Sequence, residues 1–407
     1  MKYLVVIADG MADKAVELLG GKTPMEAAKK PAMDALAKES FCGLVSNVPK
    51  GMVPESDTAN LAILSYDPRV YSKGRSPLEA VSMGIDMQPD ETAYRCNLVT
   101  LSEEGEKRYA ERRMLDHSAD EITTEEADKL IEALDKALGN ESRRLYTGIS
   151  YRHCLIWKNA PGEYPFERPH DIIGQCIGTH LPSGEEGKPY LEMMEMSYEI
   201  LKDHPVNQER RRRGLKPANS IWLWSPGKKP ALPSFEKKWG MHGAVISAVD
   251  LIKGIGICAS MKSIDVDGAT GNLHTNYKGK AEAARKAFEE GCDFVYVHVE
   301  APDECGHRGE AENKVLAIEN IDRQILEPLV QYLRNCGEAY KIMVLPDHPT
   351  PVALRTHTME PVPFLIYDSE KSEKGIASFT EAAAAETGMS IADGCHLLEH
   401  MIQTGNE

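Results

Sequence analysis

The chain has 407 residues, of which 42% are apolar and 27% charged, and its formal net charge is −16. This length exceeds what one compact core usually holds and predicts two domains, and the composition is ordinary for a globular protein in water. A surface this acidic argues against binding to the phosphate backbone of a nucleic acid. A local basic pocket for a small anionic substrate remains compatible with it. No stretch approaches the ~18 apolar residues of a membrane span.

The nine cysteines are scattered and form no Cys-x-x-Cys pair, which argues against a zinc ribbon or a dithiol redox motif. Buried, reduced thiols in a cytoplasmic protein account for them most simply. The first apolar run, residues 3–8, is too short for a signal peptide and is followed at once by Asp9. We therefore expect a cytoplasmic protein with no membrane or nucleic-acid partner. The sequence does not indicate an oligomeric state.

The N-terminal part of the chain predicts alternating strands and helices. Residues 3–8 are continuous, β-branched and apolar, which is typical of a fully buried strand. Thr23-Pro24 follows as a helix start, with threonine as the N-cap and proline at the first helical position. Residues 43–48 predict a second strand, and Ser56 lies near the start of the next helix.

The middle of the chain differs from its two ends. Strand patterns over 94–101 and 145–157 flank an amphipathic helix over 123–138, and a loop-rich stretch follows. Buried strands and helices alternate again later, with strands at 221–224, 244–246, 294–299, 341–345 and 363–367 and helices at 279–290 and 312–334. This alternation predicts an α/β fold in which helices cover both faces of a mostly parallel sheet. We expect a discontinuous core, 1–87 and 216–407, interrupted by an inserted α+β domain, 88–215.

Metal-type side chains follow several of the predicted core strands. Ligands collect at the carboxyl ends of parallel strands, so these residues are expected to lie together although they are distant in sequence. Mixed carboxylate and imidazole sites suit manganese or zinc, and magnesium less well. The set exceeds what one ion needs and predicts two ions, about 3.5–4 Å apart. Its members are Asp9, Asp303, His307, Asp347, His348 and His357.

Ser56 is the candidate nucleophile. A serine hydroxyl is a poor nucleophile unless metal coordination lowers its pKa. A helix N-terminus beside it would supply backbone N–H groups to an incoming phosphoryl group. The alternative is that Ser56 only caps its helix, and spacing alone favours that alternative.

The chain resembles the archaeal-type cofactor-independent phosphoglycerate mutases of the alkaline phosphatase superfamily. The resemblance covers nearly the whole chain and is specific as a set of motifs. The matching segments are Ala8–Asp13, Gly21–Ala28, Ser56–Leu64, Tyr94–Asn97, Asp203–Asn207, Lys216–Asn219, Gly268–Gly271, Asp303–His307 and Asp347-His348.

The resemblance implies an alkaline-phosphatase-like fold and a role for each matching position. Asp9, Ser56, Asp347 and His348 would hold one divalent ion, and three residues would hold the other: Asp303, His307 and His357. Ser56 would take the phosphoryl group, form phosphoserine and return the group to a hydroxyl. No 2,3-bisphosphoglycerate would be needed. The inserted domain would orient the substrate.

The substrate's phosphate and carboxylate call for arginine, lysine and histidine. The candidates are Arg95, Arg152, His153, His170, Asp171, Arg213 and Lys253. The candidates for the general base are Asp171 and Asp116, and the alternative to both is proton transfer through a metal-bound water. Three segments differ from the sequence motifs that are usual in this family: Met114–Ala119, Ser150–Cys154 and Pro169–Ile172. All three lie in the insertion, where the substrate would be chosen.

Three other functions remain open at this point. A bacterial branch of the family has been proposed to act as homoserine kinases, and the insertion resembles that branch. The chain has no Walker loop, so a nucleotide would have to be held by the metals and the insertion. A phosphatase would let water attack phosphoserine, but a large insertion that excludes water favours transfer. A non-enzymatic scaffold is disfavoured by the intact nucleophile and ligand set.

Overall fold

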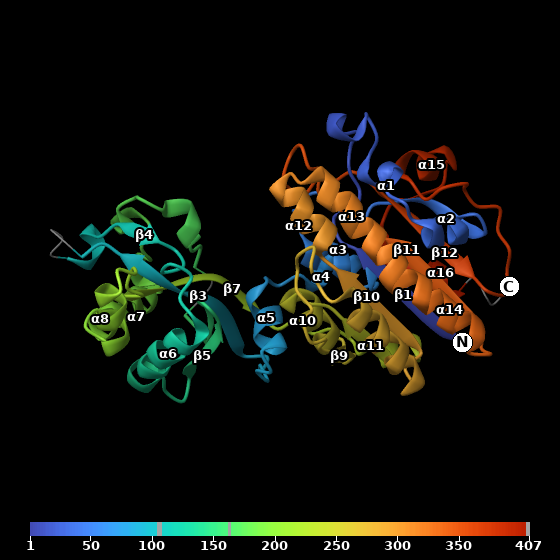
Figure 1. Cartoon of the computed structure of the whole chain (residues 1–407). Helices are drawn as coiled ribbons and strands as arrows, with labels where there is room; N and C mark the ends of the chain where they lie inside the picture. The colour runs from blue at the N-terminus through green and yellow to red at the C-terminus, as the bar shows by residue number, and fades with distance from the viewer. Residues whose placement is uncertain (104–107, 162–163, 404–407) are drawn as a thin grey trace. The chain divides into compact units, whose positions relative to one another are not determined.

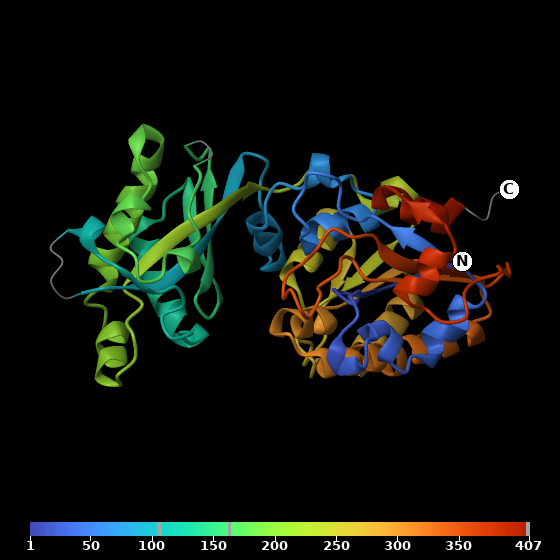
Figure 2. The ribbon, with the colours of Figure 1, turned by 90° about the horizontal axis from the view of Figure 1, so that it is seen from above.

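The computed structural model describes residues 1–103, 108–161 and 164–403. These form two compact units, Met1–Ser72 with Ala231–Glu407 (unit 1) and Lys73–Pro230 (unit 2) (Figures 1 and 2). The boundaries expected from the sequence, 88 and 215, lie inside unit 2. Helix α5 (Ser76–Ser82) packs on strands of unit 2, and β7 (Ser220–Lys228) pairs with β3 (Glu91–Leu101). These two elements therefore extend unit 2 at both ends.

Unit 1 is built on an eight-stranded sheet in the order β13-β2-β12-β11-β1-β10-β8-β9. Only β12 runs opposite to the others, because it pairs antiparallel with both of its neighbours. The sheet is thus mostly parallel, as the sequence predicts. The strands are β1 (Lys2–Ala8), β2 (Ser40–Val45), β8 (Gly243–Ile246), β9 (Lys262–Ile264), β10 (Phe294–Val299), β11 (Tyr340–Leu345), β12 (Val362–Asp368) and β13 (Ser390–Ile391).

Helices cover both faces of this sheet (Figure 1), which is why β10 and β11 are buried at every position and mostly apolar. Leu4 and Val6 of β1 join a buried cluster with α2, α11, α13 and α14. On the opposite face, Tyr296 of β10 donates a hydrogen bond to Asn60 of α3. The helices are α1 (Pro24–Ala27), α2 (Pro31–Ala37), α3 (Ser56–Ile63), α4 (Pro68–Tyr71), α9 (Phe235–Trp239), α10 (Asp250–Cys258), α11 (Tyr277–Glu289), α12 (Ala301–Arg308), α13 (Ala311–Ile321), α14 (Glu327–Asn335), α15 (Glu381–Glu386) and α16 (Leu397–Gln403).

Short helical turns complete unit 1, and one of them interrupts a helix that the sequence predicts as continuous. The expected helix over 312–334 is observed as α13, a π-helical turn and α14. The turns are η1 (Glu17–Leu19), the π-helical η5 (Asp322–Leu326) and η6 (Gly394–His396).

Unit 2 contains a five-stranded antiparallel sheet in the order β4-β3-β6-β5, with β7 on β3. One face packs against α6 and α7, and Tyr94, Leu155 and Leu223 lie in that core. Side chains alternate along a strand, so Arg95 and its neighbours at every second position face the other way. The further elements are β4 (Met114–Asp116), β5 (Arg143–Ile149), β6 (Arg152–Lys158), α6 (Thr124–Leu138), α7 (Gly184–Leu201), α8 (Pro205–Arg212), η2 (Tyr109–Glu111), η3 (Pro169–Ile172) and η4 (Ile177–Thr179).

The helix predicted over 123–138 is observed as α6, and the Thr123 side chain caps it by accepting from Glu126 N. Within the described part of the chain, no helix is both long and apolar enough to cross a membrane.

Candidate functional site

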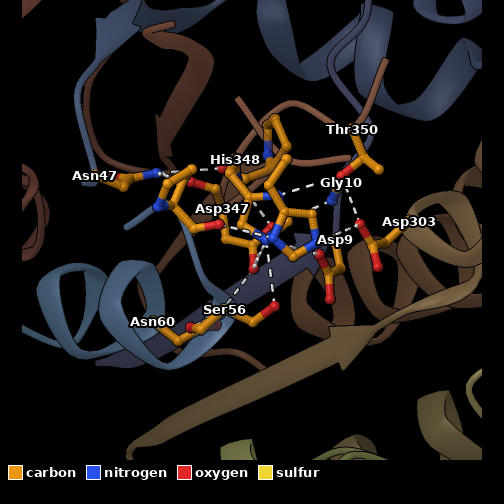
Figure 3. A network of polar contacts seen from close by, with 12 residues as sticks. Asp9, Gly10, Asn47, Ser56, Asn60, Asp303, Asp347, His348 and Thr350 are labelled. Carbon is orange, nitrogen blue, oxygen red and sulfur yellow. Dashed lines mark hydrogen bonds and ion pairs between the residues drawn. The ribbon is translucent and has the colours of Figure 1, made fainter. Parts of the chain in front are cut away.

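The carboxyl ends of three neighbouring strands bring the predicted donors together in unit 1. Strands β11, β1 and β10 are adjacent and parallel. Asp9 follows β1, Asp303 lies in α12 just after β10, and Asp347-His348 follows β11. Figure 3 shows these side chains converging with Ser56 of α3. The seven donors expected from the sequence all meet here.

One group of donors surrounds Asp9 and Asp347, both nearly inaccessible to solvent. Nε2 of His348 lies 3.6 Å from Oδ1 of Asp9 and 3.6 Å from Oδ2 of Asp347. Nε2 of His298, a strand residue of β10, lies 3.1 Å from Oδ2 of Asp9. The Ser56 hydroxyl lies 3.2 Å from Nε2 of His348. Asp9, His298 and Asp347 can each direct one ligand atom at a common point.

A second group surrounds Asp303. Its Oδ2 lies 3.2 Å from Nε2 of His307, and its Oδ1 lies 3.3 Å from Nε2 of His357. The two histidine Nε2 atoms are 2.9 Å apart. The rings of His348 and His357 stack with centroids 3.9 Å apart, which joins this group to the first. The two groups of donors thus form one continuous cluster, joined through His348 and His357.

Ser56 is the first residue of α3, and the N-cap is Glu55, whose side chain makes no capping hydrogen bond. The hydroxyl of Ser56 is therefore directed at His348 and does not cap the helix. Asn60, one turn later, donates through Nδ2 to Ser56 O (2.8 Å) and to Oδ2 of Asp347 (2.9 Å). Tyr296 in turn donates to Oδ1 of Asn60 (2.5 Å). This amide holds the helix start against the carboxylate.

A backbone N–H group and a threonine hydroxyl orient two of the carboxylates by donating hydrogen bonds to them. Gly10 N donates to Oδ1 of Asp347 (3.1 Å), and Thr350 Oγ1 donates to Oδ1 of Asp303 (2.5 Å). Gly10 has φ +62°, and a Cβ there would lie 2.6 Å from Thr350 Oγ1 and 2.7 Å from the Asp303 backbone. Only glycine fits at this point, because any side chain would separate β1 from α12.

The electrostatics of the cluster are set by burial and mutual proximity. Burial, with repulsion from Asp347 and Asp303, raises the pKa of Asp9 well above its usual range. Burial also opposes ionisation of Asp303, but hydrogen bonds from His307 and His357 outweigh it and lower that pKa well below its usual value. The same contact with Asp303 raises the pKa of His307 to about 9. Burial lowers the pKa of His298 to about 4.

This donor set fits divalent cations. Carboxylates this deeply buried are costly unless a cation balances them. Oδ1 of Asp9 is buried and, among the described residues, has no hydrogen-bond partner. Imidazole with carboxylate is the donor mixture of manganese and zinc sites. A cation between Asp9 and Asp347 would satisfy the orphaned oxygen and remove the repulsion that raises the pKa of Asp9.

Two donors of the cluster were not predicted from the sequence. His298 lies inside β10, and the signal for it was a histidine between two buried valines at the end of a core strand. Glu300 groups with Asp9 and Asp303, and burial raises its pKa to about 7. The sequence feature that could have identified Glu300 is its position between β10 and the helix that carries Asp303.

The substrate-binding candidates do not all come together. Arg95 and Arg152 share the open face of the unit 2 sheet, because their register partners place them on the same side of β3 and β6. Arg95 lies 4.7 Å from the Trp224 ring and pairs with Glu79. His170 is 5.6 Å from the same tryptophan ring. Trp224 thus links two of the predicted residues and was itself not predicted.

His117 and Tyr151 extend this face. The His117 ring lies 5.9 Å from the His170 ring and 5.5 Å from the Tyr151 ring. The Arg152 guanidinium lies 5.3 Å from the Tyr151 ring. We call the connected set Arg95, His117, Tyr151, Arg152, His170 and Trp224 the cationic face of unit 2.

His117 is held in place by a strained turn. Ala119, Asp120 and Glu121 are consecutive non-glycine residues in the left-handed region, with φ of 49°, 54° and 50°. The Asp116 carboxylate accepts hydrogen bonds from the Ser118 and Asp120 backbone and from Lys216. Such strain persists only where surrounding contacts enforce it, and it is frequent at functional sites.

Four further candidates are not members of the cationic face, although one of them lies at its edge. His153 is buried on the opposite face of β6, accepts from Gly148 N, and has its pKa lowered to about 3 by burial. Arg213 pairs with Glu126 at the end of α8. Asp171 is exposed and pairs with Arg168, and its Oδ1 lies 3.7 Å from Nε2 of His170 at the edge of the cationic face. Lys253 belongs to unit 1, where it pairs with Asp250 and Asp265.

The chain is similar to known proteins along its full length. Residues 37–207 match the family model described as 2,3-bisphosphoglycerate-independent phosphoglycerate mutase. A probable 2,3-bisphosphoglycerate-independent phosphoglycerate mutase of Geobacter sulfurreducens is 46% identical over 403 residues, which covers 99% of this chain and all of that protein. The Methanosarcina mazei enzyme of that name is 46% identical over 406 residues, with the same coverage.

Two solved structures share the fold. A Pyrococcus horikoshii protein is 27% identical with a TM-score of 0.82, covering 99% of this chain and 96% of its own. The cofactor-independent phosphoglycerate mutase of Thermoplasma acidophilum is 28% identical with a TM-score of 0.70, covering 99% of each chain.

Proposed function

The chain belongs to the 2,3-bisphosphoglycerate-independent phosphoglycerate mutase family, and on that footing we propose that it interconverts 3-phosphoglycerate and 2-phosphoglycerate through Ser56. The observation that carries the proposal is the Ser56 hydroxyl, 3.2 Å from Nε2 of His348 within a cluster of buried metal-type donors. The relatives are named as mutases and give no support to a homoserine kinase, so that alternative is dropped.

Membership of this family implies divalent metal ions and no bisphosphoglycerate cofactor. We assign Asp9, Ser56, Asp347 and His348 to one ion, and His298 lies close enough to join them. Three residues are assigned to the other ion: Asp303, His307 and His357. The histidine content favours manganese or zinc over magnesium. When bound, the ions would lower the pKa of the serine hydroxyl and balance the charge of the phosphoryl oxygens.

The chain's own residues position the nucleophile. Asn60 ties the first turn of α3 to Asp347, which fixes Ser56 at the edge of the cluster. In the first half-reaction, the bond from phosphorus to the 3-oxygen breaks as a bond to Ser56 Oγ forms, and the serine proton passes to the departing oxygen. In the second, the 2-hydroxyl attacks phosphoserine and its proton returns to Ser56. Atoms and charge balance over the two steps.

We assign recognition of the substrate anion to the cationic face of unit 2. Arg95, Arg152 and His170 were candidates by residue type, and His117 joins them by contact. The Arg152 guanidinium lies beside the Tyr151 ring, which orients its planar group and leaves its donors available to a carboxylate or phosphate. Arg95 donates through Nε and Nη2 to Glu79, so it would exchange that partner for the substrate anion. His153 and Arg213 are omitted, because His153 is buried and neutral on the core face, and Arg213 lies at the end of α8, outside the cationic face, where it pairs with Glu126.

The test is turnover of 3-phosphoglycerate by the full, manganese-loaded chain, followed by phosphorus NMR. We expect 2-phosphoglycerate from the parent chain and a loss of about 10³-fold or more in Ser56→Ala. Because Ser56 does not cap α3, the variant should keep the parent's melting temperature. Ser142→Ala, an exposed serine of unit 2, is the matched control and should keep full activity. Inorganic phosphate in place of 2-phosphoglycerate would instead identify a phosphatase and overturn the proposal.

A further inference from the structure

A second cavity lies in unit 1 and shares no residue with the metal cluster. It is a cleft of about 540 Å³ lined by residues of α11, η5 and α14. Ala281 and Leu329 form its apolar floor, and both side chains are buried. The cleft therefore offers an apolar surface of the size of a small organic molecule.

The rim of the cleft is cationic, although the chain as a whole is strongly acidic. Lys278 of α11 and Arg323 of η5 both line it, and within the described part of the chain neither makes an ion pair. Arg285 adds a third positive charge but pairs with Glu289, and Glu282 is the one carboxylate in the lining. Two unpaired cations facing one cavity attract an anion.

The π-helical turn is what places Arg323 at the cleft. Asp322 is buried and accepts hydrogen bonds from the backbone N–H groups of Ala32 and Met33, which anchors η5 at the start of α2. Asn320 Oδ1 then accepts from both Arg323 Nη2 (3.1 Å) and Gln324 Nε2 (2.8 Å). A π turn widens the helix by one residue and is frequent at functional sites. Here the polar side chains of the turn itself, Arg323 and Gln324, line the cleft together with residues of α11.

We propose that this cleft binds a small organic anion, a carboxylate or phosphate ester carried on an apolar body, with Lys278 and Arg323 on the anionic group. The apolar body would lie on Ala281 and Leu329. Such a ligand would bridge α11 to η5 and α14.

On its inner side α11 carries Lys280, which is buried and donates to His298 O (2.8 Å) at the end of β10. Binding therefore stabilises the helix that supports the metal cluster, and the melting temperature rises with ligand concentration.

The test uses 8-anilinonaphthalene-1-sulfonate, which joins an anionic group to an apolar body and fluoresces when bound. The full chain is titrated with it, and bound probe is then displaced by phenyl phosphate, by benzoate and by neutral benzyl alcohol. We expect displacement by the two anions, with a rise in melting temperature, and no displacement by the alcohol. The more effective anion shows whether phosphate or carboxylate is preferred.

Charge reversal locates the site. Lys278→Glu and Arg323→Glu should each raise the dissociation constant of the probe at least tenfold, a change of about 1.4 kcal/mol. Lys129→Glu, on the exposed side of α6 in unit 2, is the matched control and should leave it within twofold. All three variants should keep the parent's turnover and melting temperature. The proposal would be overturned if Lys278→Glu, Arg323→Glu and Lys129→Glu all bound the probe with equal affinity. It would also be overturned if benzyl alcohol displaced the probe as readily as phenyl phosphate does.

Discussion

The two units arrange charged side chains in opposite ways. In unit 1 the clustered aspartates, His298 and His348 are buried, His307 and His357 are half-buried, and the set gathers where parallel strands end (Figure 3). In unit 2 the arginines and histidines lie on one face of an antiparallel sheet and rest on aromatic rings. A convergent cluster tolerates little change, because each donor contacts at least one other donor and the two groups are joined through His348 and His357. An open face can exchange one side chain at a time, so substrate preference is more easily altered there than the phosphoryl chemistry.

The largest effect should come from breaking the cluster of unit 1 at Asp303. Asp303→Asn removes the charge that holds His307, His357 and the Thr350 hydroxyl together. We expect bound metal to fall by about one ion per chain and turnover to fall by about 10³-fold. Metal analysis of the purified protein, together with the phosphorus NMR assay, measures both.

The control is His242→Ala, a mostly exposed histidine of unit 1 outside the cluster. It should keep the full metal content and turnover. If Asp303→Asn kept both as well, Asp303 would not be a metal ligand, and the assignment of the second ion would fail.

A smaller effect should come from the cationic face of unit 2. Arg152→Ala and His117→Ala each remove one contact to the substrate anion, and we expect KM to rise about tenfold, or 1.4 kcal/mol. The metal content should stay at the parent's value, because unit 1 holds the ions. Steady-state kinetics with metal analysis separates this outcome from that of Asp303→Asn.

Arg213→Ala serves as the comparison within unit 2. It was an equal candidate by residue type, but it pairs with Glu126 at the end of α8. Its KM should stay within twofold of the parent's. A rise equal to that of Arg152→Ala would show that the cationic face does not define the substrate site.

The same contrast explains what the sequence could predict. The predicted aspartates and histidines of unit 1 follow buried strands, and parallel strands end at one edge, so the sequence pattern alone predicted that these six would lie together. Ser56 was added by the family resemblance, and the structure brings all seven into one cluster. His298 was missed because it lies within β10, where a histidine usually has a structural role. The mostly parallel sheet was also predictable from the sequence, since its central strands form short, mostly apolar runs that alternate with helices.

The site residues of unit 2 were less predictable, because the face of the sheet on which a side chain lies depends on the register of its strand. Arg152 and His153 are consecutive, yet one lies on the open face and the other is buried on the core face. A shift of one residue would exchange them, and nothing in the local sequence fixes that choice. The cationic face also depends on Trp224, which reaches it only because β7 pairs with β3 across more than a hundred residues.

The smallest effect concerns the strained turn that holds His117. Asp116→Asn keeps one acceptor oxygen but loses the charge that binds Lys216 and the second acceptor for Asp120 N. We expect a loss of about 1–2 kcal/mol in the free energy of unfolding at pH 7. Tryptophan fluorescence during urea unfolding reports it, because Trp157, Trp222 and Trp224 belong to unit 2.

The pH dependence of that loss has a defined sign. Hydrogen bonds from Lys216 and from the Ser118 and Asp120 backbone outweigh burial and lower the pKa of Asp116 below its unfolded value. Its contribution is therefore complete above about pH 4 and is lost as the pH falls through the folded pKa. The difference between parent and Asp116→Asn should stay constant from pH 7 to about pH 4 and shrink progressively as the pH falls further. The exposed control Asp86→Asn should unfold like the parent over the same range. A difference that stayed constant with pH would mean that the Asp116 charge does not stabilise the turn, and that shape alone holds His117 in place.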